Sequence, residues 1–497
     1  MTTADPAQTY HDQCHQFFEK TAPEKARATG FVKNQSPLDG RLFLLTMVLT
    51  ALTQAALPLS QLAVMAHRLE ETVSVTGQAF KERYSEAAVQ WLQAMLVEAL
   101  RLSVPSAASD VVQLLQAFSA VKLLDASVVP LPDTLKKEYP GCGGVGASAA
   151  LKIYLVLNWL TGQYDTLHFE TGRKADQNMG QTFLTQAQAG TLWLFDLGFF
   201  QVAFLAALAQ AQNYFLCRLQ TQVNLYCRNA QGNVEKLDLD ELLRRAPRET
   251  FELDVLVGPA QVASRLIAVP VPSAQANERR RKARAKAKKH GRVPTQKTLA
   301  RLDWTLLLTN APVEKLPTST VLAVYGVRWQ VELAFKLCKS DFQVDVTLAT
   351  EPQRVKCEFY AKLIALLLFN RLTGVAENLL GERISPTKLF RQMRNDVDHW
   401  WQAFSGGRAT ATRAWLQFLR RYIQPTWRKS QSTLVHLQAL TAGAEQRKLL
   451  DPLGFLQAKL KNAAAKAAAF KQRLSVQLLS FVADGGGFQR TTTDSMP

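Results

Sequence analysis

The sequence predicts an α/β fold, in which a mixed β-sheet core is interrupted by a mainly β insertion and flanked by helical amino- and carboxyl-terminal regions. Two short apolar strands each lead into an aspartate, Asp125 and Asp196. A third carboxylate, Glu332, follows on a segment with helical periodicity. The interval between Asp196 and Glu332 is far longer than a compact core needs for one more strand and helix, and therefore predicts an inserted domain.

The amino-terminal region, residues 1–115, has the apolar periodicity of helices. We expect helices over 42–56, 59–70 and 78–100. The break at residues 71–77 could form a helix-turn-helix with Thr76 as the cap of its second helix. Any small helical domain contains such turns, so DNA recognition by this one stays an open alternative.

The two core strands have the same pattern, an apolar run that ends in a carboxylate. Residues 121–125 form the first, and we expect a turn at Pro130 and Pro132. Residues 191–196 form the second, with Gly198 as the turn residue. An aspartate after one strand is more often a turn or cap residue than a catalytic group.

Two further strands are predicted between these aspartates, at 151–160 and 166–169, with Gly162 near their turn. The order is therefore strand, aspartate, hairpin, strand, aspartate, and finally a helix with glutamate. This is the order expected of a ribonuclease-H-like core. Three carboxylates in this order are more specific than any one of them.

The insertion carries β-branched, strand-like segments at 223–228, 251–257 and 262–271. The run from Arg279 to Arg292 then contains nine Lys or Arg residues and no acid. Like-charge repulsion predicts that this run is extended or mobile when free and ordered on DNA phosphates. We expect DNA contacts from its first four residues, Arg279, Arg280, Arg281 and Lys282; the alternative is a solvated loop.

The spacing of Tyr325, Arg328, Glu332 and Lys339 fits one face of one helix. At ~100° per residue they span an arc of about 60°. Apolar residues take the other side, namely Val327, Val331, Ala334, Leu337 and Cys338. Such a face places a carboxylate among two cations and a phenol. The plainer alternative is a solvated face with an Arg328–Glu332 i,i+4 pair.

The carboxyl-terminal region returns to helical patterns. Residues 355–374 are apolar, residues 385–430 carry four tryptophans among many arginines, and residues 459–473 predict an alanine-rich basic helix. This region could pack on the core, clamp DNA or form a dimer.

The bulk composition favours a polyanionic partner. The net charge is +18, from 59 Lys plus Arg against 41 Asp plus Glu. Six cysteines without a CxxC pair indicate reduced thiols and a cytoplasmic location. We expect no membrane association, since the apolar segments 43–57 and 363–369 are too short or too interrupted to span a bilayer.

The segment that begins Trp304-Thr-Leu-Leu-Leu-Thr-Asn and continues to Tyr325-Gly-Val-Arg-Trp-Gln-Val-Glu-Leu-Ala-Phe-Lys resembles the YREK signature of the insertion-sequence-four family of DDE transposases. Lys339 stands at the family spacing. The resemblance covers roughly residues 40–375. It implies a DDE transposase with a ribonuclease-H-like core that performs cut-and-paste transposition by end cleavage, a hairpin intermediate and strand transfer.

The resemblance also implies roles for individual residues. Asp125, Asp196 and Glu332 would be the catalytic carboxylates and would hold two Mg²⁺ ions, for which Mn²⁺ could substitute. Arg328 and Lys339 would bind the flanking phosphates, and Tyr325 would position the cleaved strand. The implied partners are double-stranded DNA with terminal inverted repeats, target DNA and a second copy of the chain in the synaptic complex.

Trp304 has two interpretations. A tryptophan at the start of an apolar strand is usually a core residue. In hairpin-forming members of the family, however, a tryptophan at this distance before the signature tyrosine stacks on a flipped base. Stacking of this kind is worth ~1–3 kcal/mol.

These patterns give five expected regions. They are a helical DNA-binding domain at 1–115, the first part of the core at 116–220, a β-rich insertion with its basic loop at 221–302, the second part of the core at 303–375, and a helical region at 376–497 that could dimerise. Two other functions remain possible on the sequence: a nuclease with the same core, and a DNA-binding protein that descends from a transposase and has no catalysis.

Overall fold

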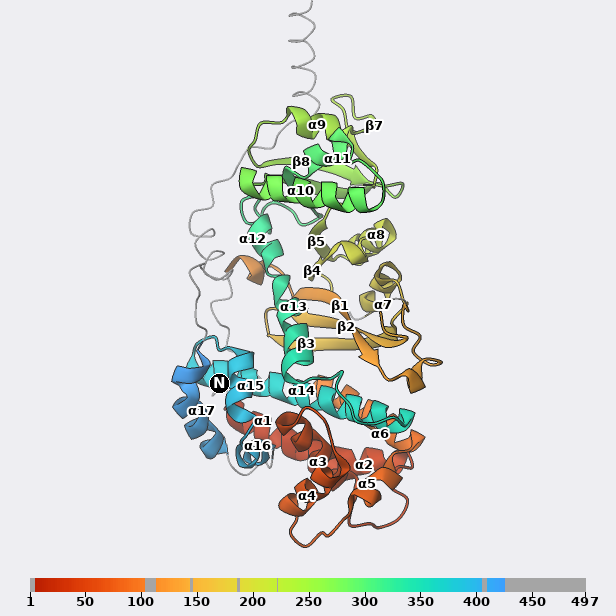
Figure 1. Cartoon of the computed structure of the whole chain (residues 1–497). Coiled ribbons are helices and arrows are strands. Elements are labelled where there is room, and N and C mark those ends of the chain that lie inside the picture. Colours follow the sequence, from red (N-terminus) through yellow and green to blue (C-terminus); the bar gives the residue numbers. More distant parts are fainter. Residues whose placement is uncertain are drawn as a thin grey trace, which may run out of the picture. The chain divides into compact units, whose positions relative to one another are not determined.

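The computed structural model describes residues 5–102, 113–143, 146–185, 188–220, 222–404 and 409–424. These residues divide into two compact units. The first holds the residues up to Val223 and those from Leu307 onward, and the second holds Asn224–Leu306. Figure 1 labels the elements of both units.

The first unit begins with a helical region. Its α-helices are α1 Pro6–His15, α2 Ala22–Ala28, α3 Gly40–Thr53, α4 Leu59–Leu69, α5 Gly77–Arg83 and α6 Glu86–Arg101, with a π-helical turn, η1, at Gln16–Thr21. Helices α3 and α4 match two predicted segments. The continuous helix predicted over 78–100 is wrong, because Ser85 caps a new helix by accepting a hydrogen bond from the Ala88 amide at 3.3 Å.

The turn before α5 is capped as predicted. The Thr76 hydroxyl accepts from the Ala79 amide at 3.3 Å. Helices α4 and α5 pack against each other. The segment between α4 and α5 therefore connects two packed helices, and a helix-turn-helix that recognises DNA stays a prediction.

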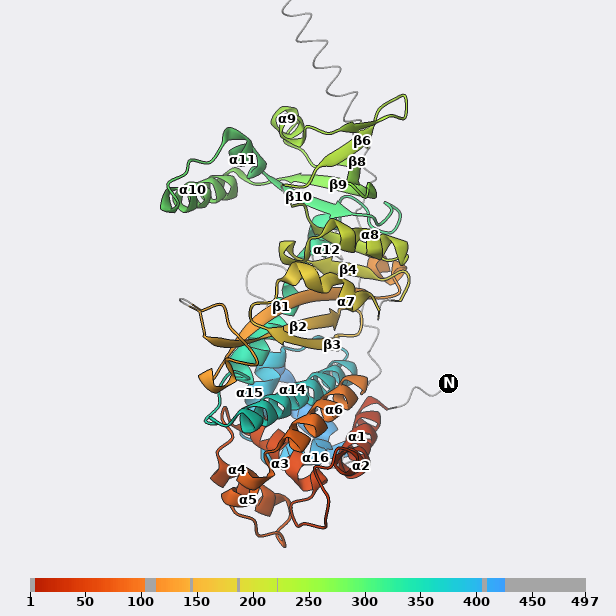
Figure 2. The ribbon, with the colours of Figure 1, turned by 90° about the vertical axis from the view of Figure 1, so that its right-hand side faces the viewer.

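Helix α14, Pro352–Leu380, is the central helix of this region and packs on α3 and α6 (Figure 2). Among the described residues it is the one helix long and apolar enough to cross a membrane by length and composition, and 67% of its most apolar stretch is buried inside the protein. It is therefore a core helix, as predicted for its apolar segment.

Three more helices follow α14, at α15 Pro386–Met393, α16 Val397–Phe404 and α17 Ala409–Ile423. The predicted helix at 459–473 and the last tryptophan of the carboxyl-terminal region, Trp427, lie outside the described residues.

The first unit also contains a mixed sheet. Its strands are β1 Val121–Leu131, β2 Ala149–Asn158, β3 Gln163–Thr171, β4 Leu192–Phe195, β5 Tyr214–Arg218 and the second half of β10 Trp304–Thr309. They are hydrogen-bonded in the order β3-β2-β1-β4-β5-β10. Pairs β1–β4 and β4–β5 are parallel, and β1–β2, β2–β3 and β5–β10 are antiparallel. The prediction of a mixed sheet is confirmed.

Short helices connect these strands. They are the 3₁₀ turns η2 Gln113–Ala117, η3 Asp133–Leu135, η4 Asp176–Met179 and η5 Leu197–Phe199, together with α7 Gly180–Leu184 and α8 Val202–Gln210. Gly162 has a φ of 68° in the β2–β3 turn, a conformation that glycine adopts without a steric penalty. The turn predicted at this position is confirmed.

The turn predicted at Pro130 and Pro132 is partly wrong, because β1 continues through Pro130 to Leu131. Beyond Leu124, β1 is paired with β2 alone among the described strands. A proline, which lacks an amide proton, is tolerated in a strand segment that needs a partner on one side only.

The second unit is mainly β, with strands β6 Leu225–Arg228, β7 Val234–Lys236, β8 Phe251–Val257, β9 Val262–Pro270 and the first half of β10. Strands β6, β8 and β9 match the three predicted segments. They pair in the order β10-β9-β8-β6-β7. Three helices accompany them, α9 Leu239–Arg245, α10 Ser273–Lys289 and α11 Gln296–Arg301.

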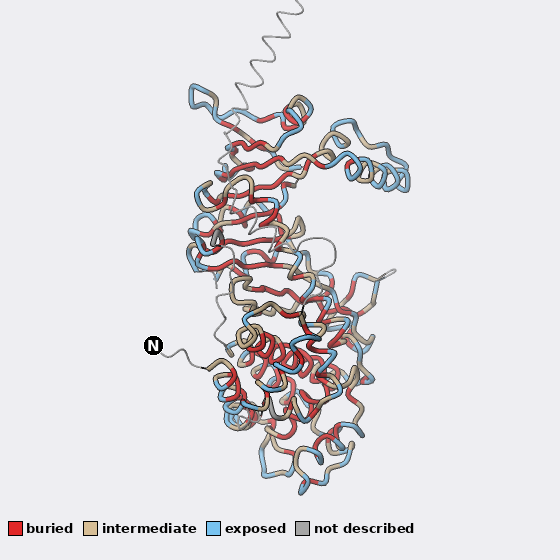
Figure 3. The backbone as a smooth tube through the Cα atoms, turned by 90° about the vertical axis from the view of Figure 1, so that its left-hand side faces the viewer, coloured by how far each residue is buried: buried red, intermediate tan, exposed pale blue. Residues whose placement is uncertain are grey.

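Helix α10 corrects the expectation that the basic run is extended when free. Three alanines separate its basic residues, and Glu278 pairs with Arg281 at 2.8 Å and with Lys282 at 3.5 Å. Alanine is the strongest helix former, and i,i+3 and i,i+4 ion pairs offset part of the like-charge repulsion. The run is therefore a preformed helix whose basic side is exposed (Figure 3).

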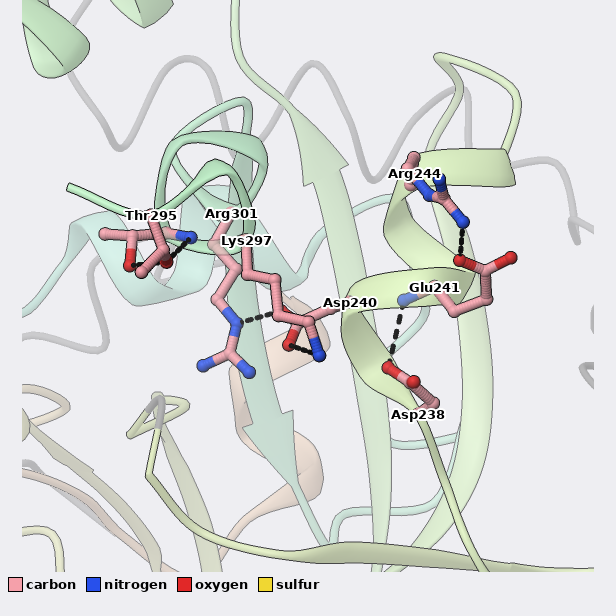
Figure 4. Close-up of polar contacts among 8 residues, drawn as sticks. Asp238, Asp240, Glu241, Arg244, Thr295, Lys297 and Arg301 are labelled. Carbon is pink, nitrogen blue, oxygen red and sulfur yellow. Dashed lines mark hydrogen bonds and ion pairs between the residues drawn. The ribbon is translucent and has the colours of Figure 1, made fainter.

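Helix α11, which follows α10, is tied to α9. Arg301 Nε donates to Asp240 Oδ1 at 2.5 Å, and Lys297 lies 3.9 Å from the same carboxylate (Figure 4). Each helix also has a side-chain cap, from Asp238 for α9 and from Thr295 for α11. The chain that leaves α10 is therefore anchored to the body of the second unit.

Candidate active site

Asp125 and Asp196 lie next to each other because of the register of two parallel strands. The parallel pairing of β1 and β4 ends at Leu124 opposite Phe195. Each aspartate is the next residue along its chain. Parallel strands end at one edge of a sheet, so the two carboxylates emerge at the same level.

Each aspartate is held by a local hydrogen bond. Asp125 Oδ1 accepts from the Ala126 amide at 2.8 Å. Asp196 Oδ1 accepts from the Gly198 amide at 2.8 Å and caps η5. The predicted turn at Gly198 is confirmed as this 3₁₀ turn.

Two asparagines add side-chain hydrogen bonds to the backbone pairing around β4 and β5. Asn213 Oδ1 accepts from the Thr191 amide at 3.2 Å, just before β4. Asn310, at the end of β10, accepts from the Phe215 amide at 2.8 Å and donates to the Asn213 carbonyl at 2.9 Å. Asn213 therefore ties the residue before β4 to the start of β5, and Asn310 ties the start of β5 to the end of β10.

The segment with Glu332 is not the single helix that the spacing predicts. It consists of α12 Val321–Gly326, α13 Trp329–Lys336 and a π-helical turn, η6 Leu337–Asp341. Tighter i→i−3 hydrogen bonds at Val327 and Arg328 interrupt the α-helical pattern. The backbone stays right-handed at the junction, with Arg328 at φ −50° and ψ −30°, so the residues keep a common side.

The apolar side of this segment is buried as predicted. Its five members are at most 8% exposed, namely Val327, Val331, Ala334, Leu337 and Cys338. The helical path therefore presents its charged residues on the remaining side.

Arg328 bridges the helix and the strand. Its Nη2 donates to Glu332 Oε1 at 2.6 Å, the i,i+4 pair of the plainer interpretation. Its Nη1 also lies 3.7 Å from Asp125 Oδ2. The guanidinium carbon lies 5.8 Å from the centre of the Tyr325 ring. The structure therefore brings Asp125, Arg328 and Glu332 together.

The site concentrates negative charge. Burial raises the pKa of Asp125 to about 6; the Ala126 amide and Arg328 act against this rise, and the carboxylates of Asp196 and Glu332 add to it. Asp196 is therefore close enough to Asp125 to repel its charge. The three predicted carboxylates form one electrostatic cluster.

Tyr325 and Arg218 border this cluster. Burial raises the pKa of Tyr325, and Arg328 and Arg218 oppose the rise. Arg218, the last residue of β5, was not among the predicted site residues; the signal for it is an apolar strand that ends in a cation. Lys339 Nζ donates to the Val128 carbonyl of β1 at 2.6 Å. Trp329, beside Arg328, is 57% exposed.

The donor set suits a hard divalent cation, for which carboxylate oxygens are the preferred protein ligands. In the part of the chain that the structure describes, no three such side chains already form a metal-binding group. Instead, the guanidinium of Arg328 forms ion pairs with Asp125 and Glu332. The mutual repulsion that contributes to the raised pKa of Asp125 is the kind of charge excess that a cation relieves. The residues present therefore fit a divalent cation, although they are not arranged around one.

The predicted DNA-binding residues of the second unit fall into two classes. Arg279 donates to the Trp304 carbonyl at 3.4 Å, and Arg280 pairs with Asp303, so both fasten α10 to the unit. Arg281 and Lys282 are each 76% exposed.

Trp304 is 6% exposed and packs edge-to-face on Phe251 at 5.3 Å. This burial favours the core interpretation, and base stacking stays a prediction.

A family model described as "Transposase DDE domain" matches residues 116–368. The transposase for insertion sequence element IS231F of Bacillus thuringiensis subsp. israelensis is 29% identical over 360 residues, which cover 69% of this chain and 75% of that protein. The transposase for IS231B of Bacillus thuringiensis subsp. berliner is 24% identical over 450 residues, 86% of this chain and 94% of that protein.

Another relative is the transposase for insertion sequence element IS1151 of Clostridium perfringens, 26% identical over 385 residues, 73% of this chain and 81% of that protein. Among solved structures, a piggyBac transposase synaptic complex with hairpin DNA aligns with a TM-score of 0.44 at 10% identity over 87% of each chain. The family model spans half of the sequence and contains all three clustered carboxylates. The chain belongs to the transposase DDE domain family.

Proposed function

We propose that this transposase moves an insertion sequence by cut-and-paste transposition, through end cleavage, a hairpin intermediate and strand transfer. The family implies the use of divalent metal. Two Mg²⁺ ions, for which Mn²⁺ could substitute, would be held by Asp125, Asp196 and Glu332. The observation that carries this proposal is the cluster itself: two aspartates at the ends of parallel pairing, and a glutamate joined to one of them through Arg328.

A ribonuclease-H-like core is part of this proposal. It is supported by a mixed sheet of order β3-β2-β1-β4-β5, with an antiparallel hairpin on one side and parallel strands on the other. Asp125 lies within β1, directly after its pairing with β4 ends, and Asp196 directly follows β4. A chain that folds in this way delivers carboxylates from distant positions to one sheet edge.

The chemistry divides between cations and side chains. When bound, the cations would activate water or a DNA 3′-hydroxyl and stabilise the leaving oxygen. Arg328 is forked and can bind two oxygens of one phosphate, whereas Lys339 offers a point charge. Tyr325 is half-buried beside Arg328 and would orient the cleaved strand.

DNA is the proposed partner, as an end with terminal inverted repeats and as a target. The net charge of +18 and the exposed side of α10 support this. Phosphate contacts fix the position of a protein on DNA without selecting a sequence. We therefore propose that α10 contacts the DNA backbone and that the amino-terminal helices recognise the DNA sequence. A homodimer would bring the two transposon ends together.

The test is a strand-transfer assay with the full chain, a labelled transposon-end duplex, a supercoiled target and Mg²⁺. We expect nicked ends, hairpins and joined products in that order of appearance. Nicks without joined products would indicate a nuclease with the same core. Binding of the end without any nick would indicate a DNA-binding protein without catalysis.

A further inference from the structure

We infer that Arg328 keeps the metal site closed until DNA is bound: its guanidinium neutralises the carboxylates that a divalent cation needs, and a substrate phosphate releases it. This inference rests on the proposed function, because it takes Asp125 and Glu332 as metal ligands. It adds an order of binding and a defined role for Arg328 before the reaction begins.

The first support is the position of the guanidinium. It lies 2.6 Å from Glu332 on its own helix and 3.7 Å from Asp125 on β1. A charge placed between two carboxylates offsets the repulsion that a metal ion would otherwise offset. Within the described residues no three ligands are already gathered into a metal-binding group. A cation that enters must therefore compete with Arg328.

The second support is the unused capacity of Arg328. Its side chain is 17% exposed, and its buried Nε has no hydrogen-bond partner among the described residues. A guanidinium has five N–H donors in a fixed fork, which matches two oxygens of a phosphate. The contacts with Asp125 and Glu332 leave part of this fork unsatisfied. A phosphate beside the site offers Arg328 a better partner.

The exchange links two binding events. When Arg328 turns to a phosphate, Asp125 and Glu332 lose their counter-charge, and the site then favours a divalent cation. By thermodynamic linkage the reverse holds: a bound cation frees Arg328 for the phosphate by the same factor. Metal and DNA are therefore expected to bind cooperatively, and the site is not assembled away from DNA.

The experiment titrates Mn²⁺ into the full-length protein, with and without a transposon-end duplex, and measures free Mn²⁺ by electron paramagnetic resonance. Arg328→Gln should tighten Mn²⁺ binding to the DNA-free protein by about 10- to 150-fold, the scale of a removed charge-assisted hydrogen bond. The duplex should tighten Mn²⁺ binding in the wild type and much less in this variant. Arg244→Gln, which removes the same charge from the exposed Arg244–Glu241 pair of α9, is the matched control.

An Arg328→Gln protein with a wild-type melting temperature and unchanged or weaker Mn²⁺ binding would overturn the inference. If that variant fails to fold, Arg328→Lys is used in its place, because lysine keeps the positive charge but lacks the forked N–H donors of the guanidinium. It should keep the Mn²⁺ affinity of the DNA-free protein and lose most of the effect of the duplex; an undiminished effect would overturn the inference. Glu332→Gln separates the two proposals, since wild-type Mn²⁺ binding by this variant would refute the metal site itself.

Discussion

Helices α13 and α10 both present basic side chains, but in opposite settings. In the α13 segment Arg328 is 17% exposed and is matched by two carboxylates. On α10, Arg281 and Lys282 are each 76% exposed, and one glutamate serves both. The same residue types therefore produce a defined local geometry in one helix and a general positive field in the other.

This difference predicts how the two regions respond to change. Charges that are partly buried and mutually matched act as a unit, so the removal of one leaves the others uncompensated. Exposed charges act nearly independently and are screened by salt. We expect large, all-or-none effects at the carboxylate cluster and small, additive effects on α10.

The largest expected effect is at the carboxylates. Asp125→Asn, Asp196→Asn and Glu332→Gln should each abolish end cleavage and leave end binding nearly unchanged. A loss of several kcal/mol of charge stabilisation corresponds to about 10³-fold or more in rate. Cleavage and binding of one labelled end measure this, with Asp398→Asn, 71% exposed on α16, as control. Mg²⁺-dependent nicking near the wild-type rate by any variant would remove that residue from the site.

The next effect concerns Trp304, whose backbone carbonyl receives Arg279 at the base of α10. Because the indole is 6% exposed, Trp304→Ala should lower stability by ~3–5 kcal/mol and reduce all DNA activities together. Trp304→Phe should recover most of this. Melting temperature is measured beside nicking and hairpin yields.

The opposite result for Trp304 is equally clear. An unchanged melting temperature with a selective loss of hairpins, by about 5- to 150-fold for ~1–3 kcal/mol of stacking, would establish base stacking and refute the core interpretation.

A third effect is the pH dependence of stability. The pKa of Asp125 rises to about 6 from its ordinary value of 3.8. The folded state therefore favours the protonated acid, and this contribution is full below about pH 4 and lost as pH rises through 6. Asp125→Asn should stabilise the metal-free protein by up to about 3 kcal/mol above pH 6 and by little at pH 4. Thermal melts in a chelator across this range measure the difference, which should not be constant with pH.

The smallest effect is on α10 and separates its two classes of arginine. Arg281→Ala, Lys282→Ala and Arg284→Ala together should reduce the salt slope of DNA binding by about 0.9 for each phosphate that is no longer neutralised. Arg280→Ala should instead lower thermal stability, because it leaves Asp303 without one of its cations. Arg244→Ala, an exposed arginine of α9 paired with Glu241, controls for charge. A slope equal to that of the wild type would make α10 a solvated helix.

Much of the sheet could be predicted because apolar, β-branched segments are local signals. Strand β8 at Phe251–Val257 matches its predicted segment, and Glu332 lies opposite a buried apolar side, as periodicity indicated. The position of Asp125 was predicted, but the continuation of β1 beyond it was not. Pairing with β2 decides where β1 ends, and no local pattern records that partner.

Long-range partners account for the other differences. The helix of α10 depends on Glu278, just outside the acid-free run, and on Asp303, which is distant in sequence. Arg218 lies near Tyr325 because β5 is parallel to β4, a relation that the sequence does not display. The pairing of Arg328 with Asp125 is likewise invisible in spacing, whereas its pairing with Glu332 follows from one helical turn.

Strand β4 has a consequence for how this protein could vary. All four of its side chains are buried, so an alternation of inward and outward residues does not define its register, and a slip by one residue would carry Asp196 to the other face. The Asn213 amide binds the residue before β4, and Asn310 in turn holds Asn213 and the start of β5, so the two support the alignment of β4 from its neighbour. In a library of random substitutions, the apolar residues of β4 should be replaceable by one another. The two asparagines, although they lie outside the acidic cluster, should tolerate almost no replacement.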